Sequence, residues 1–356
     1  MGASITHSGE AEAAPHPRRS HLGERLLVLA LFAAALTAAV LVVRGSGIVD
    51  SGSSAGSAAA AAPGQPVTSL EWPAGGLSLA ATSEGIVWEQ RSATPFVSGL
   101  WCYDPASGTS RRLVKRSLLG RTAGALVAFG STVGWTARPR TASGDPEVRG
   151  YDLQTGRQFT ASRHGTAPGG CDQALAWVDS SRRLGPAGTV VVGLDLVTDA
   201  RFVVRTGVPV RRVVTNGRWT AWLGGQAVVV LDRRNGRRYA VGRRATAVAL
   251  DGTAVVWASR LRDGRTAIAA WDLETRRPRR LYSVDSRVTD LVLSEQLVVW
   301  RQASNGGDVW ALERLTGHVS AVCAAPSQQS APVVAGRTVF WADRRNGGWQ
   351  LYRRTL

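Results

Sequence analysis

A short apolar segment that ends in Trp occurs seven times in this 356-residue sequence. The seven Trp lie 35 to 47 residues apart, which is the length of one four-stranded blade. No amphipathic helical pattern of about ten residues lies between these segments, which excludes repeated βαβ units. The sequence therefore predicts an all-β fold, a seven-bladed β-propeller of four-stranded blades. The repeated residues are Trp88, Trp135, Trp177, Trp222, Trp257, Trp300 and Trp341.

A second apolar segment follows in six of the repeats and ends in an acid that begins a turn. Because Asp in this place bonds backbone amides of its own turn, we interpret these acids as structural. The repeated Trp are likewise interpreted as a buried layer between blades, because indole buries a large apolar area. The acids are Asp104, Asp152, Asp195, Asp232, Asp272 and Glu313.

Hairpin turns are marked by Asn-Gly, since all four Asn of the chain precede Gly. This pair is typical of the type I′ turn, in which both residues take a positive φ. The four are Asn216, Asn235, Asn305 and Asn346. For the sixth repeat, the pattern predicts strands over about 287–293, 296–302, 308–314 and 318–324.

The two ends of the repeat region complement each other. The seventh repeat stops after its third strand, at 352–356, and one spare strand, 67–72, precedes the first repeat. Pairing the two would cover two exposed strand edges. We therefore predict that residues 67–356 form the propeller and that the N-terminal strand closes its last blade.

Two repeat segments carry a family resemblance. Phe340 to Tyr352 and Tyr151 to Gly156 resemble the repeats of TolB-type bacterial propellers. The sequence departs from TolB itself, because no α/β domain is recognised before the repeats and a hydrophobic segment stands there instead. The resemblance implies a propeller of the bacterial cell envelope, and it implies no particular partner.

Residues 26–43 form an apolar run in which Thr37 is the only polar member. As a helix this run is about 27 Å long, close to the thickness of the hydrocarbon core. Basic residues before it predict a cytoplasmic tail, 1–25, and a propeller outside the cytoplasm. Residues 44–66 are rich in Gly, Ser and Ala and are interpreted as a flexible linker. The prediction is a single-pass plasma-membrane protein, and a secreted protein with a cleaved signal peptide is the alternative.

The chain has a formal net charge of +17, with 43 Lys and Arg against 26 Asp and Glu. Such a surplus favours binding to polyanions such as lipid headgroups or wall polymers, whereas nucleic acid is not expected outside the cytoplasm. Arg pairs at 111–112, 237–238 and 276–280 are expected on one face of the disc. Loops between second and third strands would place a set of possible polyanion contacts on the other face: Arg138, Arg140, Arg182, Arg183, Arg260, Arg262, Arg344 and Arg345.

Signatures of catalysis are scarce. The sequence contains no P-loop and no GxGxxG, and the GxSxG at 52–56 lies in the linker, where a nucleophile elbow has no strand–turn–helix context. Only His164 and His318 follow the membrane segment, in different repeats, so no catalytic, cofactor or metal residues are predicted. Cys102 and Cys171 could pair and leave Cys323 buried, or all three could be buried thiols.

These observations favour a non-catalytic binding or scaffold module, expected as a monomer, for an envelope protein or an anionic cell-surface polymer. A propeller lyase or hydrolase with its site at the channel mouth is the alternative. Titratable residues converging on the axis would favour the enzyme. An axis lined by Ser, Thr, Ala and Gly would count against it.

Overall fold

The structure is a computed structural model that describes residues 64–70, 78–91, 98–115, 121–122, 126–138, 144–181, 183–303 and 306–356. Every described residue belongs to one compact unit, 58–356. The predicted cytoplasmic tail, transmembrane helix and most of the predicted linker lie outside the described residues. Within the described part of the chain, no helix has the length and apolar character needed to cross a membrane.

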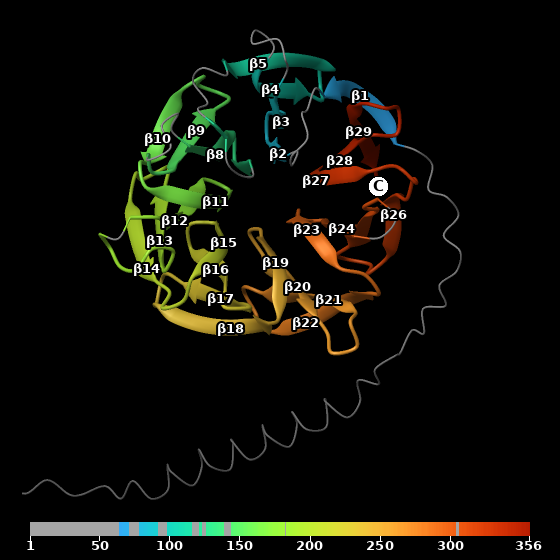
Figure 1. Cartoon of the computed structure of the whole chain (residues 1–356). Helices are drawn as coiled ribbons and strands as arrows, with labels where there is room; N and C mark the ends of the chain where they lie inside the picture. Colours follow the sequence, from blue (N-terminus) through green and yellow to red (C-terminus); the bar gives the residue numbers. More distant parts are fainter. Residues whose placement is uncertain are drawn as a thin grey trace, which may run out of the picture. The chain divides into compact units, whose positions relative to one another are not determined.

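The described residues form seven antiparallel sheets arranged as the blades of a propeller, which confirms the predicted fold class (Figure 1). Blade 1 contains β2 (Leu79–Thr82), β3 (Gly85–Gln90), β4 (Gly99–Asp104) and β5 (Thr109–Lys115). Blade 2 contains β6 (Arg121–Thr122), β7 (Val127–Phe129), β8 (Thr132–Arg138), β9 (Glu147–Asp152) and β10 (Gln158–Ser162). Blade 3 contains β11 (Gly165–Cys171), β12 (Ala174–Asp179), β13 (Val190–Asp195) and β14 (Arg201–Arg205).

The remaining four blades follow in chain order. Blade 4 contains β15 (Val210–Thr215), β16 (Trp219–Gly224), β17 (Ala227–Asp232) and β18 (Arg237–Arg243). Blade 5 contains β19 (Ala245–Leu250), β20 (Ala254–Arg260), β21 (Thr266–Asp272) and β22 (Pro278–Val284). Blade 6 contains β23 (Val288–Leu293), β24 (Leu297–Gln302), β25 (Val309–Glu313) and β26 (Val319–Cys323), each within one residue of its predicted bounds. Blade 7 contains β27 (Gln329–Ala335), β28 (Thr338–Asp343), β29 (Trp349–Thr355) and β1 (Gln65–Leu70).

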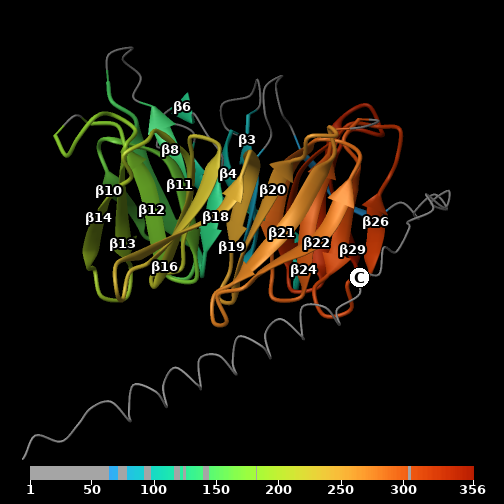
Figure 2. The ribbon, with the colours of Figure 1, turned by 90° about the horizontal axis from the view of Figure 1, so that it is seen from below.

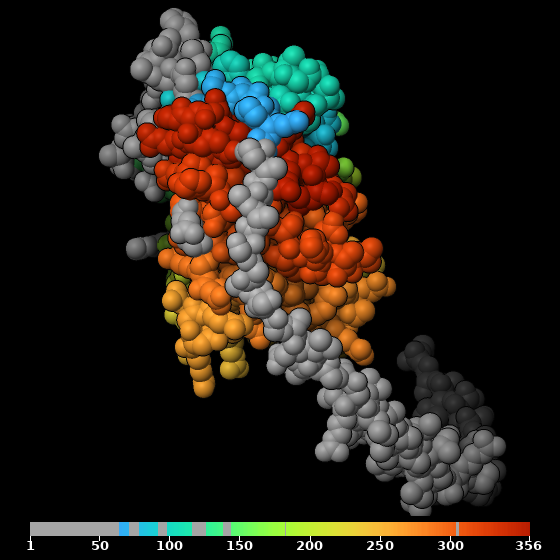
Figure 3. Space-filling model, turned by 90° about the vertical axis from the view of Figure 1, so that its right-hand side faces the viewer, coloured from blue at the N-terminus to red at the C-terminus, as the bar shows by residue number. Residues whose placement is uncertain are grey.

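The ring is closed by the N-terminal strand, as predicted. β1 pairs antiparallel with β29, from Gln65 opposite Arg353 to Leu70 opposite Trp349. Leu70 is only 4% exposed and packs into the core between blades 7 and 1. Figure 3 shows β1 in blue against the red strands of blade 7, with blade 1 in teal beyond it. The closing strand begins at Gln65, inside the segment that the composition assigned to the linker.

The repeated Trp form the buried layer predicted between blades, and all seven are at most 4% exposed. Their indole N–H groups differ in whether they have a hydrogen-bond partner, although the Trp itself is repeated in every blade. Trp88 Nε1 donates to Gln90 Oε1 at 2.9 Å, because Gln90 follows Trp88 by two residues on β3. The corresponding position after Trp135 is Ala137, and the Trp135 Nε1 has no hydrogen-bond partner among the described residues.

This difference predicts unequal effects of one substitution. Trp88→Phe and Trp135→Phe remove the same part of a buried ring, but only the first leaves a buried amide oxygen without its donor. We expect Trp88→Phe to lower the free energy of unfolding by about 1 kcal/mol more than Trp135→Phe. Urea denaturation of both variants measures the difference, and equal losses would show that the Gln90 bond contributes nothing.

The turns between third and fourth strands confirm the role assigned to the repeated Asp. In the turn after β17, Asp232 Oδ1 accepts the backbone N–H of Arg234 at 3.1 Å. The N–H of Gly236 donates to the Asp232 carbonyl at 2.8 Å, and Gly236 has a φ of 71°. The Asn residues before the glycines are not in the left-handed region at 216, 235 and 346, so these turns are not type I′. The reason is loop length, because each of these loops has at least three residues, whereas a type I′ turn joins its strands through two.

Candidate functional site: the axial channel and the blade-connecting face

The disc has two faces, between which the strands run (Figure 2). The blade-connecting face carries the segments that join one blade to the next and the loops between second and third strands, including 180–189, 261–265, 324–328 and 344–348. The hairpin face carries the turns between first and second strands and between third and fourth strands. Those predicted polyanion contacts that the structure describes lie in these loops or at the strand ends beside them.

Four of the predicted polyanion contacts are exposed on that face: Arg183, Arg260, Arg262 and Arg344. They come from blades 3, 5 and 7, and none forms an ion pair with a described residue. They are therefore spread over the face rather than gathered at one point. Arg140 and Arg182 lie outside the described residues, and of Arg138 only the backbone, at the end of β8, is described.

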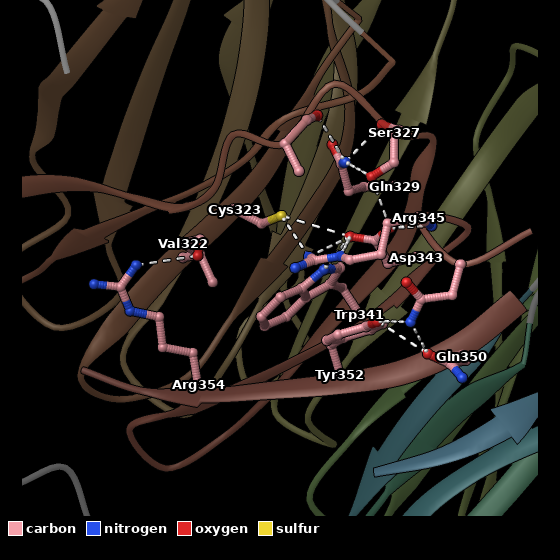
Figure 4. A network of polar contacts seen from close by, with 12 residues as sticks. Val322, Cys323, Ser327, Gln329, Trp341, Asp343, Arg345, Gln350, Tyr352 and Arg354 are labelled. Carbon is pink, nitrogen blue, oxygen red and sulfur yellow. Dashed lines mark hydrogen bonds and ion pairs between the residues drawn. The ribbon is translucent and has the colours of Figure 1, made fainter. Parts of the chain in front are cut away.

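Unlike these four arginines, Arg345 forms an ion pair, and its partner is the fully buried Asp343 (Figure 4). Arg345 donates its backbone N–H to Asp343 Oδ1 at 2.9 Å and its Nε–H to Oδ2 at 3.0 Å. Its guanidinium also lies over the ring of Tyr352, 4.2 Å from the centroid. The structure therefore assigns Arg345 to the core of blade 7 rather than to a binding surface.

Asp343 contacts two further side chains around this ion pair. Ser327, between β26 and β27, donates to Oδ1 at 2.8 Å, and Trp341 Nε1 lies 3.4 Å from Oδ2. Burial alone would raise the pKa of Asp343, but hydrogen bonds from Arg345 and Ser327 outweigh it and hold the pKa below the ordinary value. Beside this network lies an open hollow of about 610 Å³, lined by residues 325–328 with Arg344, Arg345 and Gly347.

All three cysteines are free thiols in the structure, so the Cys102–Cys171 pairing is not formed. Cys102 lies on β4 of blade 1 and Cys171 ends β11 of blade 3, so the two belong to different blades. Burial raises the pKa of the Cys102 thiol to about 11 and also raises the pKa of Cys171 and Cys323. Such thiols stay protonated at neutral pH and are poor nucleophiles.

Two further arginines connect neighbouring blades on the hairpin face. Arg314 of blade 6 donates to the side chain of Asp251 and to Thr253 Oγ1 in blade 5. Arg337 of blade 7 likewise pairs with Glu313 of blade 6. The expectation that all the Arg pairs lie on this face is wrong. Three outermost strands, β5, β18 and β22, contain Arg111, Arg112, Arg237, Arg238, Arg279 and Arg280, which therefore lie on the circumference, whereas Arg276 and Arg277 stand in the turn before β22.

The axis of the propeller is a channel lined mostly by apolar side chains. Its lining comes from the innermost strands of all seven blades and encloses a cavity of about 170 Å³. The lining residues are 79–81, 126–128, 168–170, 212, 214, 249–250, 291–293 and 333–334. Apart from Arg212 they are Leu, Val, Ala, Gly and Pro, so Arg212 is the one charged residue among them. The lining is thus more apolar than the Ser, Thr, Ala and Gly axis that would count against an enzyme.

Arg212 is the residue that sequence reasoning missed. The residue after it, Val213, pairs with the repeated Trp222, and the equivalent pairs in blades 5 and 6 follow Ala247 and Asp290. Superposing the repeats on their Trp would therefore have shown an arginine on an innermost strand. The Arg211-Arg212 doublet is not among the Arg pairs that the sequence pattern singled out.

Few other titratable groups come together. His164 Nδ1 lies 2.6 Å from Asp145 Oδ2, and both side chains are at least one-third exposed. His318 lies in the turn before β26, in another blade. Among the described residues, no three His, Cys, Asp or Glu side chains are placed to hold a metal ion.

No family model and no curated protein sequence matches this chain. It is similar in structure to an oligogalacturonate lyase in complex with manganese, with 14% identity, a TM-score of 0.57, and 77% of this chain and 86% of the lyase covered. The β-propeller domain of the Trilobed protease from Pyrococcus furiosus has 11% identity and a TM-score of 0.55, covering 82% of this chain and 96% of the domain. A chain of the mitotic checkpoint complex has 13% identity and a TM-score of 0.53, covering 83% and 90%. At these identities the likeness shows the fold alone, and it spans enzymes and other assemblies alike.

Proposed function

We propose that this chain is a non-catalytic binding module whose blade-connecting face binds an anionic polymer of the cell surface. The observation that carries the proposal is the set of four exposed arginines on that face, none of which is paired with an acid among the described residues. Arginine that is not neutralised by the fold keeps its full attraction for carboxylate and phosphate groups. Their spread over three blades suits an extended polymer better than a small ligand.

The location is part of the same proposal. The apolar run at 26–43 and the basic residues before it support a membrane anchor with the propeller outside the cytoplasm. The resemblance to TolB-type repeats supports a place in a bacterial envelope. A tethered propeller would then meet wall polymers and lipid headgroups rather than nucleic acid.

The apolar axis supports binding rather than catalysis. General acid–base chemistry needs a pair of titratable groups within reach of one substrate. The described residues that line the channel include no carboxylate, imidazole or thiol that could act as such a group.

Binding of the full-length chain to polyphosphate and to alginate tests the proposal, with neutral dextran as the comparison. We expect binding to both anionic polymers to weaken by roughly 50-fold between 50 and 200 mM salt, if each of four arginines releases one counterion as on a single-stranded nucleic acid. Changing Arg183, Arg260, Arg262 and Arg344 together to Gln should weaken binding at least tenfold at the lower salt concentration.

A matched control removes the same charge from the circumference. Arg111, Arg205, Arg237 and Arg279 are exposed on outermost strands, and changing them together to Gln should leave most of the binding intact. Equal losses in the two quadruple variants would mean that net charge, and not this face, attracts the polymer. Binding that is insensitive to salt would contradict an electrostatic contact altogether.

A further inference from the structure

Arg212 holds a charge for which the fold supplies no partner. It makes no hydrogen bond or ion pair with any described residue. The acid that acts on it electrostatically is Asp290, two blades further along the ring. Asp290 is itself bonded to Arg301, whose Nε lies 2.6 Å from Asp290 Oδ2. The positive charge of Arg212 therefore has no ion-pair partner among the described residues inside the channel.

The other side chains that line the channel around this guanidinium are apolar. Arg212 is accessible to solvent, but the space that it faces is the channel, which all seven blades enclose. Leu250, Leu291 and Val333 are among the side chains that line the same space. Burial accordingly lowers the pKa of the Arg212 guanidinium, and the charge of Asp290 only partly offsets this effect. An arginine nevertheless stays protonated in a protein, so the charge is permanent.

The cavity has room for a small molecule. Its volume of about 170 Å³ is close to that of an engineered apolar cavity of about 150 Å³ that binds benzene. A ligand of this size would place its apolar part against the leucines and valines. Its polar end would contact the guanidinium of Arg212, which is the one charged group among the described lining residues.

We propose that the axial channel binds a small organic anion, a carboxylate or phosphate monoester with a compact apolar part, and that Arg212 anchors its charged group. The planar guanidinium matches both anions because it donates two parallel N–H bonds. A cation is disfavoured by the charge of Arg212. A neutral apolar molecule would leave that charge unpaired in a less polar environment than water. This site lies in the channel and does not depend on polymer binding at the blade-connecting face.

Titration calorimetry of the full-length chain tests the site with three probes of similar size. Benzoate and phenyl phosphate carry the two anionic groups, and benzyl alcohol is the neutral comparison. We expect saturable binding of at least one anion, at least tenfold tighter than benzyl alcohol. The stronger of the two anions identifies the carboxylate or the phosphate as the preferred group.

Substitutions locate the binding site. Arg212→Gln should weaken binding of the preferred anion at least tenfold, and Arg212→Lys should retain part of it, because the charge remains while the planar pair of donors is lost. Arg211→Gln is the matched control, since it removes an equal charge from the neighbouring residue of β15, whose guanidinium contacts the Ala245 carbonyl at 3.5 Å. This variant should bind as the wild type does.

Three results would overturn the proposal. The first is an absence of saturable binding of both anions to the wild-type chain. The second is equal affinity of the wild type and a folded Arg212→Gln variant. The third is an equal loss in Arg211→Gln, which would mean that general positive charge attracts the probe. Circular dichroism of each variant establishes that it is folded before its affinity is compared.

Discussion

Deleting residues 65–70 is expected to remove at least about 5 kcal/mol from the free energy of unfolding, summing net backbone hydrogen bonds of about 1 kcal/mol each and the burial of one leucine. The deletion removes β1, which supplies the fourth strand of blade 7. The outer edge of β29 would then be unpaired, and the core between blades 7 and 1 would lose Leu70. An exposed strand edge also favours association with other chains.

Thermal unfolding followed by circular dichroism measures the effect, together with size-exclusion chromatography for association. Deletion of residues 52–57 is the control, because it shortens the predicted linker by the same number of residues. It should leave the unfolding transition unchanged. A β1-deleted chain that unfolds at the wild-type temperature would mean that the ring is held by its first-to-last blade packing alone.

Asp343→Asn is expected to lower the free energy of unfolding by about 3 kcal/mol, the lower end of the range for breaking a buried ion pair. Asp343 is fully buried, and the side chain of Arg345 is only 17% exposed, so the loss leaves a mostly buried guanidinium without its carboxylate. Ser327 and Cys323 also lose the charged oxygens to which they donate.

The same carboxylate predicts a dependence on pH. Its pKa is lowered in the folded state, so the folded protein keeps the proton off more readily than the unfolded chain does. The stabilisation is therefore complete above the ordinary Asp pKa of about 4. It is lost as the pH falls from there through the lowered pKa.

Asp179→Asn is the matched control for this prediction. Asp179 also follows its repeated Trp by two residues and is 5% exposed, but its carboxylate bonds only to the nearby Ser181 among the described residues. Its loss should cost about 1 kcal/mol. Denaturant unfolding of both variants at pH 7 and at acid pH measures the contrast. Equal losses of unfolding free energy in the two variants would contradict the role given to the ion pair. So would a loss in the Asp343→Asn variant that is as large at acid pH as at pH 7.

The fold of this chain is predictable because the residues that specify each blade lie within one short segment and are repeated. Each blade needs a buried strand with a large apolar residue at one place, and Trp300 or Trp341 satisfies that need from within its own segment. The partner of the spare strand before the first repeat could be predicted by counting strands, since the seventh repeat had three strands and lacked a fourth. The start of β1 at Gln65 was missed because Gln65 and Pro66 have the composition of a linker.

The sequence by itself thus determined the seven-bladed architecture, the buried Trp layer and the closure of the ring. Only the tertiary structure decided which arginines are free. Arg344 and Arg345 are neighbours of the same type, yet one is exposed and the other is paired with a buried carboxylate. Arg211 and Arg212 form a second such pair, and only Arg212 lines the channel. The physical reason is that the exposure and pairing of a charged side chain depend on groups that are distant in the chain. Examples are Ser327 for Asp343 and the six other blades for Arg212, and a local sequence pattern does not show which groups will lie nearby.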